Sequence, residues 1–177
     1  MSGNHIVYII GFMGSGKTSV GKNLARRLKM RFVDLDTEIE KDLGLSIPEI
    51  FKKSGENYFR EVETKIIRLF SLLDNQVIAT GGGAVLRAEN IAELKKNGRI
   101  FYISATPETI YNRIKDEVHR PLLAGKKGEE TEAEIKKLLS FRRELYEKSG
   151  TEIRTDGLTP DEIAAEIEKH LRKGNKL

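Results

Sequence analysis

Short runs of apolar, β-branched residues alternate along the chain with longer segments in which apolar residues recur every three or four positions. The short runs are typical of buried parallel strands, and the recurrences are typical of amphipathic helices. Strands that alternate with helices form a parallel sheet wrapped by helices, so the chain is predicted to be an α/β domain. The predicted strands lie at residues 5–10, 32–33, 77–79, 100–103 and 151–154.

More helix stands between the second and third predicted strands than a crossover needs. Residues 37–75 contain a capping-box pattern, Thr37-Glu38-Ile39-Glu40, which predicts a helix that starts after Thr37. Ser54-Gly55 is expected to break a later helix. This segment is therefore predicted to be a helical substrate-binding insertion. By contrast, residues 116–130 lack periodicity and contain Arg120 followed by glycines, which is typical of a lid over phosphate groups.

The segment from Gly11 to Thr18 follows the first predicted strand and precedes the first predicted helix. Its sequence, G-F-M-G-S-G-K-T, fits the phosphate-binding pattern G-x-x-x-x-G-K-[ST]. Glycines let backbone N–H groups turn towards an anion, Lys17 adds a charge for the β- and γ-phosphates, and the Thr18 hydroxyl can ligate Mg²⁺. The predicted nucleotide contacts are Gly14, Ser15, Gly16, Lys17, Thr18 and Ser19.

Residues with chemical character also follow the second and third predicted strands, and ligands of parallel sheets bind at such carboxyl ends. Asp34 and Asp36 follow the second strand, and Gly81-Gly82-Gly83 follows the third. A carboxylate so placed either reaches Mg²⁺, directly or through water, or accepts the proton of an attacking hydroxyl. Because the third strand ends in Thr80-Gly81 rather than in an aspartate, Asp34 is the better candidate for the metal.

The composition narrows the class of protein. Of the 177 residues 38% are hydrophobic, which suffices for the core of one domain, and none is cysteine, which excludes disulfides and thiolate metal sites. No run approaches the ~20 apolar residues of a membrane span, and we expect no signal peptide. The net charge is +4, but the arginines stand singly or in pairs, which suits phosphate and carboxylate ligands better than nucleic acid. We therefore expect a cytoplasmic monomer with no nucleic-acid or membrane partner.

Taken in order, these segments resemble the shikimate kinases. The resemblance rests on G-F-M-G-S-G-K-T, F-V-D-L-D, Y-F-R-E-V-E, the glycine triplet, R-P-L-L-A-G and R-x-x-L-Y, and it covers nearly the whole chain. The loop alone is shared by a large superfamily, whereas the motifs together are far more specific. The resemblance implies a single three-layer P-loop kinase domain over residues 1–177. It also implies transfer of the γ-phosphoryl group of ATP to the 3-hydroxyl of shikimate, with Mg²⁺, in aromatic amino-acid biosynthesis.

On the acceptor side, the resemblance assigns roles by position. Asp36 would bind the shikimate hydroxyls and act as, or assist, the base. Arg60 and Arg142 would hold the shikimate carboxylate, for which the planar guanidinium fork is suited. Gly81 and Gly82 would line the shikimate ring.

On the nucleotide side, the resemblance adds two arginines and a metal contact to the glycine loop. Arg120 would reach the phosphates from the lid, and with Lys17 it would neutralise the transferring group. Arg113 would lie near the adenine. Asp34 would hold Mg²⁺ through water, and Thr18 would ligate it.

Some alternatives stay open at this point. The chain has Arg142-Arg143-Glu144-Leu145-Tyr146 where the family commonly has R-x-P-L-Y, so the choice of Arg142 over Arg143 rests on counting back from Leu145-Tyr146. A related small-molecule kinase, such as a gluconate kinase, would share the loop without needing the paired arginines. A GTP-dependent switch protein would need an N-K-x-D-type guanine motif, which the sequence lacks, and a nucleic-acid-binding module would show steeply salt-dependent binding.

Overall fold

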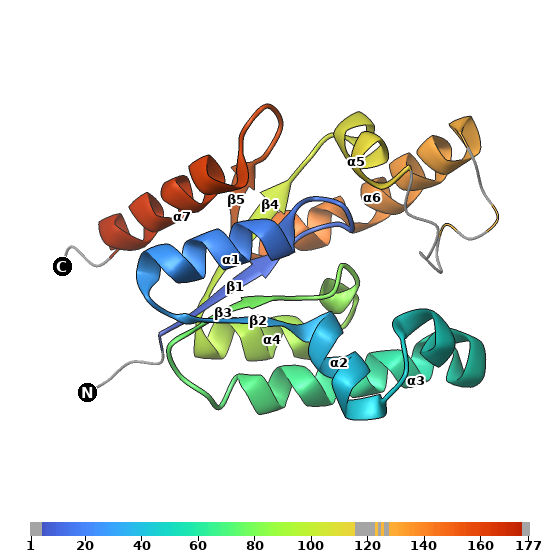
Figure 1. Cartoon of the computed structure of the whole chain (residues 1–177), viewed down its shortest axis with the longest axis horizontal. Coiled ribbons are helices and arrows are strands. Elements are labelled where there is room, and N and C mark those ends of the chain that lie inside the picture. Colours follow the sequence, from blue (N-terminus) through green and yellow to red (C-terminus); the bar gives the residue numbers. More distant parts are fainter. Residues whose placement is uncertain (1–4, 116–122, 124, 126–127, 175–177) are drawn as a thin grey trace.

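The computed structural model describes residues 5–115, 123, 125 and 128–174. In this part of the chain a parallel sheet of five strands lies between two layers of helices, as predicted (Figure 1). The strand order is β2-β3-β1-β4-β5, so the first strand of the chain is the central one. The strands are β1 (Ile6–Ile10), β2 (Arg31–Asp34), β3 (Gln76–Ala79), β4 (Arg99–Ser104) and β5 (Thr151–Arg154).

Two separate hydrophobic cores explain why the strands read as continuous apolar runs. On one face of the sheet, Val7 and Ile9 of β1 pack with buried residues of α1 (Lys17–Leu28) and α7 (Pro160–Gly174). On the other face, Ile6, Tyr8 and Ile10 pack towards the remaining helices. Since successive side chains of a strand point to opposite faces, both faces need apolar residues. The helices of the second layer are α3 (Ile47–Phe70), α4 (Ala88–Asn97) and α6 (Glu129–Ser149).

The register of the central strands brings three segments to the same level at the carboxyl edge of the sheet. Asp34 of β2 pairs with Ala79 of β3, and Ala79 pairs with Ile9 of β1. Because the strands are parallel, the residues that follow these three positions leave the sheet together. The glycine loop, the aspartate pair and the glycine triplet therefore meet at one edge.

Helix α2 (Leu35–Leu43) begins three residues earlier than the sequence pattern predicted. Its N-cap is Asp34, whose side chain accepts a hydrogen bond from the N–H of Asp36, so the predicted capping box at Thr37 is wrong. The physical reason is that Asp34 is itself a good cap and stands at the end of β2, where the chain must turn. Glu40 does not bond the predicted cap; its carboxylate accepts a hydrogen bond of 2.9 Å from the N–H of Ile47.

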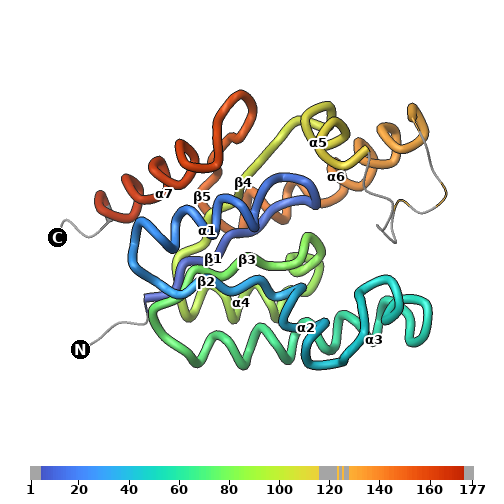
Figure 2. The backbone as a smooth tube through the Cα atoms, in the orientation of Figure 1, coloured from blue at the N-terminus to red at the C-terminus, as the bar shows by residue number. Residues whose placement is uncertain are grey.

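Helix α3 is interrupted at Gly55, where the backbone leaves helical geometry (φ +79°, ψ 170°), as predicted. Figure 2 shows that α2 and the first part of α3 lie beyond the end of the sheet, whereas the later part of α3 runs beside it. The remaining helical elements are α5 (Pro107–Ile114) and the short 3₁₀ helix η1 (Ala84–Leu86).

The predicted lid falls largely on residues that the structure does not describe. Residues 116–122, 124, 126 and 127 lie outside the described part, and Arg120 is among them. Helix α6 begins at Glu129, so the last two residues of the predicted lid belong to this helix. Within the described residues, no helix is both long enough and apolar enough to span a membrane.

Candidate active site

The glycine loop after β1 adopts a conformation that ordinary residues resist. Gly14 and Gly16 have φ values of +73° and +99°, and Gly16 is the N-cap of α1. A side chain at either position would be strained. The ammonium group of Lys17 bends back over the loop and donates to the carbonyls of Gly11 (3.0 Å) and Phe12 (2.9 Å). The loop thus presents a positive charge at the N-terminus of a helix, which suits an anion.

Thr18 and Asp34 supply two adjacent oxygen atoms beside this loop. The Thr18 hydroxyl donates to Asp34 Oδ2 at 2.7 Å, while Asp34 Oδ1 accepts from the N–H of Asp36 at 3.2 Å. Such oxygen ligands suit Mg²⁺, which commonly takes one or two protein ligands together with substrate phosphates. Among the described residues, no three His, Cys, Asp or Glu side chains gather so as to hold a metal ion. Thr18 and Asp34 therefore fit a Mg²⁺ ion whose remaining ligands would come from the nucleotide phosphates.

Each glycine of the triplet after β3 allows a different close contact. A Cβ atom on Gly82 would lie 3.1 Å from the backbone nitrogen of Met13 in the glycine loop. A Cβ on Gly81 would lie 2.5 Å from Glu63 and 2.7 Å from Asp36, and a Cβ on Gly83 would overlap the guanidinium of Arg60.

The triplet therefore joins the phosphate loop to the acidic and basic groups on its other side. The absence of a side chain is a steric requirement at Gly81 and Gly83, where a Cβ would overlap the facing side chains, and at Gly82 a Cβ would make a tight contact with the backbone of the glycine loop.

Arg60 is held between two carboxylates of its own helix. It is 7% exposed and bonds Glu63 (2.8 Å) and Glu56 (3.0 Å), one helical turn away on either side. Glu63 is fully buried, and this burial, opposed by Arg60 and reinforced by Asp36, raises its pKa from 4.5 to about 6. Burial lowers the pKa of Arg60, but the two carboxylates outweigh it and the net direction is upward. Arg60 is thus a fixed cation beside Gly83.

Arg142 of α6 points inward, whereas its neighbour Arg143 is exposed. Arg142 is 4% exposed and lies over the ring of Phe12, with 5.7 Å between the guanidinium carbon and the ring centroid. Its Nη1 donates to the carbonyl of Gly82 over a long 3.4 Å, and its Nε, also buried, has no partner. Only Arg142 of the two candidates therefore reaches the glycine triplet.

Arg113 of α5 reaches the glycine loop from the β4 side of β1, whereas the glycine triplet approaches it from the β3 side. Its Nη1 donates to the carbonyls of Ser15 (3.0 Å) and Gly14 (3.4 Å) and lies 3.4 Å from the hydroxyl of Thr155, which follows β5. The side chain predicted to lie near adenine therefore joins the phosphate loop to the end of β5.

A cavity of about 510 Å³ opens at this edge of the sheet. Arg60, Gly81 and Arg142 are not among its lining residues and adjoin it through the glycine triplet. Of five buried side-chain polar atoms that lack a partner in the described part of the chain, three lie beside the glycine loop or the glycine triplet rather than in the cavity lining. Since buried polar groups are normally hydrogen-bonded, such atoms indicate a place for a ligand. The lining includes Lys17, Thr18, Ser19, Asp34, Asp36, Gly82 and Arg113, and the three atoms are Ser15 Oγ, Glu63 Oε1 and Arg142 Nε.

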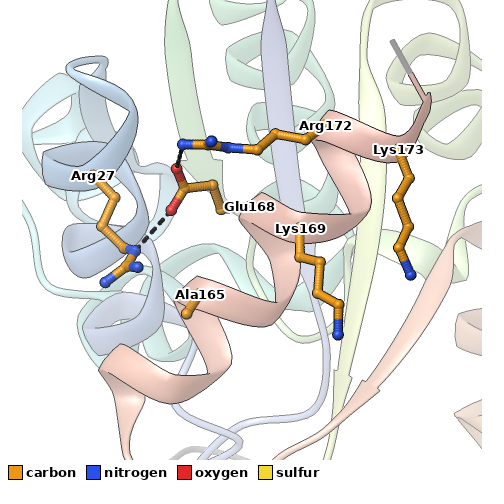
Figure 3. A pocket seen from close by; sticks show the side chains of 6 residues that line it. All are labelled: Arg27, Ala165, Glu168, Lys169, Arg172 and Lys173. Carbon is orange, nitrogen blue, oxygen red and sulfur yellow. Dashed lines mark hydrogen bonds and ion pairs between the residues drawn. The ribbon is translucent and has the colours of Figure 1, made fainter. Parts of the chain in front are cut away.

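A second pocket lies between α1 and α7, near the other end of α1 (Figure 3). Its one carboxylate, Glu168, accepts from Arg27 at 2.9 Å and from Arg172 at 2.6 Å. Figure 3 shows that the bond from Arg27 joins α1 to α7, whereas the bond from Arg172 lies within α7; Lys169 and Lys173 point away from Glu168. The charges here stabilise the packing of two helices.

Two buried residues of the site were not predicted from the sequence. Glu63 stands three residues after Arg60, and Tyr146 stands four residues after Arg142, where its hydroxyl donates to the carbonyl of Gly82. Helical spacing of three or four places two side chains on one face and is the signal that could have found them.

The chain matches the family model described as shikimate kinase over residues 13–172. It is 49% identical over 167 residues to a shikimate kinase of Thermodesulfovibrio yellowstonii, covering 94% of this chain and 95% of that one. It is 46% identical over 172 residues to a shikimate kinase of Caldicellulosiruptor bescii, covering 96% and 98%.

Among solved structures, the fold is similar to shikimate kinase from Acinetobacter baumannii in complex with shikimate. The TM-score is 0.92 at 34% identity, and the match covers 98% of this chain and 96% of that one. The expected alternative, a gluconate kinase, is not favoured by these findings.

Proposed function

Since the chain belongs to the shikimate kinase family of ATP-dependent kinases, we propose that the cavity at the carboxyl ends of β1, β2 and β3 is where it acts. The reaction is transfer of the γ-phosphoryl group of ATP to the 3-hydroxyl of shikimate, which gives shikimate 3-phosphate. One observation carries the proposal. Within the glycine triplet, Gly82 contacts the phosphate loop. Gly81 contacts the side chains of Asp36 and Glu63, and Gly83 contacts that of Arg60. The donor and acceptor sites therefore adjoin.

On the donor side, the triphosphate lies in the glycine loop at the N-terminus of α1. Lys17 exchanges its bonds to the carbonyls of Gly11 and Phe12 for the β- and γ-phosphates, and the N–H groups from Gly14 to Ser19 hold the chain of phosphates. Arg113 stays on the loop carbonyls near the adenine. Arg120 lies outside the described residues, and we propose that it contributes its positive charge to the phosphates as part of a lid formed by the segment before α6.

On the acceptor side, Arg60 and Arg142 bind the shikimate carboxylate. Arg142 supports this role because its Nε is buried without a partner and its bond to Gly82 is long. Arg60 supports it because its position is fixed before any ligand arrives. Gly81 and Gly82 allow the ring to approach the backbone closely. We propose further that residues 37–75, which carry Arg60, form the substrate-binding insertion of a single domain.

Asp36 accepts the proton of the attacking hydroxyl. It lies against Gly81 and follows the end of β2, so its carboxylate faces the place where donor and acceptor sites adjoin. Phosphoryl transfer depends mainly on in-line placement and on neutralisation of charge, and the fixed groups on both sides supply these. The enclosing segments also exclude water, which would otherwise compete with the shikimate hydroxyl.

Thr18 and Asp34 would hold Mg²⁺, Thr18 through its hydroxyl and Asp34 through water. The ion, when bound with ATP, would neutralise charge on the β- and γ-phosphates. We also propose that the protein is a cytoplasmic monomer without nucleic-acid or membrane partners, because its arginines stand singly or in pairs and form no basic tract.

The proposal is tested by coupled-assay turnover of ATP with shikimate and with gluconate, each with and without Mg²⁺. We expect turnover with shikimate alone, and only when Mg²⁺ is present. Equal turnover of gluconate would contradict the acceptor assignment, and turnover after removal of divalent cations would contradict the metal assignment.

A further inference from the structure

The hydroxyl of Tyr146 has a single orientation available to it. Tyr146 is fully buried in α6, and its hydroxyl donates to the backbone carbonyl of Gly82, since a carbonyl can only accept. Burial raises the pKa of this phenol, against the smaller effect of the neighbouring Arg142, so it remains a donor at neutral pH. The bond joins the core of the second helical layer to the middle of the glycine triplet.

The ring of Tyr146 is itself held by the sheet. It stacks on Tyr102 of β4, with 4.9 Å between the ring centroids and 11° between the planes. Because β4 pairs directly with the central strand β1, the hydroxyl of Tyr146 is fixed relative to the strand that bears the phosphate loop.

This bond fixes a whole peptide unit. A peptide group is planar and trans, so the carbonyl of Gly82 and the N–H of Gly83 point in opposite directions. A peptide between two glycines is otherwise the easiest of all to rotate. Within the described part of the chain, the N–H groups of Gly82 and Gly83 donate to no acceptor. Holding the carbonyl against α6 therefore leaves the donor on the other side of the plane fixed in direction.

We propose that Tyr146 is a positioning residue for the acceptor substrate, a role that rests on the proposed function of Gly82 and Arg142. Its hydroxyl keeps the Gly82–Gly83 peptide in one orientation, and it acts on the substrate only through that peptide and through Arg142.

The effect on Arg142 follows from the shared acceptor. Arg142 and Tyr146 both donate to the carbonyl of Gly82, Arg142 over the longer distance of 3.4 Å. When a carboxylate draws Arg142 away, Tyr146 still satisfies the carbonyl, so no buried acceptor is left unpaired. Without the hydroxyl, Arg142 is the remaining donor for Gly82, and binding the substrate would break its bond to that carbonyl.

The test is Tyr146→Phe, with Tyr102→Phe as the matched control. The first change removes the hydroxyl that bonds Gly82, and the second removes the hydroxyl from the other ring of the same stacked pair. We expect Tyr146→Phe to raise KM for shikimate by roughly 5- to 100-fold, the range for an unpaired buried acceptor, with KM for ATP within about twofold of wild type. Tyr102→Phe should leave both values unchanged. KM does not depend on the fraction of folded enzyme, so a partly misfolded preparation still gives an answer.

Three further outcomes separate this inference from the function on which it rests. An unchanged KM for shikimate in Tyr146→Phe, or an equal rise in Tyr102→Phe, would overturn the positioning role. If Arg142→Lys raises KM for shikimate and Tyr146→Phe does not, only the positioning role fails. If Arg142→Lys also has no effect, the proposed acceptor site fails. When Tyr146→Phe and Arg142→Lys are combined, we expect KM for shikimate to rise by less than the product of the two single effects, because both residues act on one carbonyl.

Discussion

The pocket between α1 and α7 and the cavity at the strand ends are both lined by charged side chains, but their charges are arranged in opposite ways. In the first, Glu168 is bonded by Arg27 and Arg172, and these groups neutralise one another at the surface. In the second, Glu63 and Arg142 are almost fully buried and each has an atom without a partner. Paired charges at a surface need no ligand, whereas buried unpaired atoms are costly unless a ligand completes them.

The comparison teaches that local density of charge is a poor guide to function. By charge alone the α1–α7 pocket would be the stronger candidate for an anion. The cavity at the strand ends is distinguished instead by glycines that bring backbone and side chains into close contact, and by polar atoms left without partners. The following changes should affect the two regions differently.

The largest effect is expected from Lys17→Met. The lysine is the cation of the phosphate loop, so its loss should abolish transfer in the coupled assay. Lys22→Met, an exposed change on the same helix, is the control and should retain wild-type turnover. Near-wild-type turnover of Lys17→Met would overturn the assignment of the loop.

Asp36→Asn should lower kcat by ~10²-fold or more, because the amide cannot accept the proton of the attacking hydroxyl. The measurement is kcat at saturating shikimate and ATP. Asp42→Asn, an exposed change on the same helix, should have no effect. An unchanged kcat in Asp36→Asn would remove the role of base from this residue.

Arg60→Ala should raise KM for shikimate by roughly 10- to 100-fold, the range for a lost charge-assisted hydrogen bond, while ATP binding survives. Its control is Arg68→Ala, a change on the same helix as Arg60 that breaks an exposed ion pair with Glu89 of α4. Equal loss of affinity for both substrates would count against a carboxylate-binding role.

The affinity for shikimate should fall as the pH rises through about 6. The pKa of Glu63 is about 6, and the charged groups that affect it are Arg60, Asp36 and Arg87. A substrate carboxylate placed at Arg60 adds negative charge and raises this pKa further, so binding takes up a proton and is favoured below pH 6. The effect can reach about tenfold for each further unit of pKa shift.

Calorimetric titration with shikimate at pH 5.5 and pH 7.5 measures this dependence. Glu63→Gln, which cannot ionise, should bind shikimate equally at both values. If the glutamine variant keeps the wild-type dependence, another group is responsible and the assignment to Glu63 is wrong.

The smallest effect is expected from Glu168→Gln in the α1–α7 pocket. Kinetic constants should stay at wild-type values, and the melting midpoint should fall by roughly 2 °C at most, because ion pairs at a protein surface contribute little. The loss should shrink further at high salt. A change in either KM would mean that this pocket takes part in substrate binding, and the contrast between the two regions would fail.

The strands and the phosphate loop could be predicted because their signals are local. Each strand is apolar on both faces, and the glycines of the loop stand at fixed spacing between a strand and a helix. The choice between Thr37 and Asp34 as cap of α2 could not be made locally, because both are good caps and the end of β2 decided between them.

The roles of Glu63 and Tyr146 could not be predicted for a different reason. On sequence alone, Glu63 after Arg60 looks like an ordinary pair on an exposed helix face, since such spacing is common at surfaces. What buries Glu63 is the glycine triplet, which comes 18 or more residues later, and what gives Tyr146 its acceptor lies 64 residues earlier. Burial of this kind depends on contacts between distant segments, which a reading of periodicity does not contain.

The order of the strands also has a consequence for synthesis on the ribosome. The strand that carries the phosphate loop is made first, yet it ends up in the centre of the sheet with β3 and β4 as its neighbours. A nascent chain therefore cannot support its nucleotide site from both sides until Ser104, the end of β4, has emerged. Arg142 and Tyr146 follow later still, so a growing chain should acquire the means to hold ATP before it can recognise an acceptor.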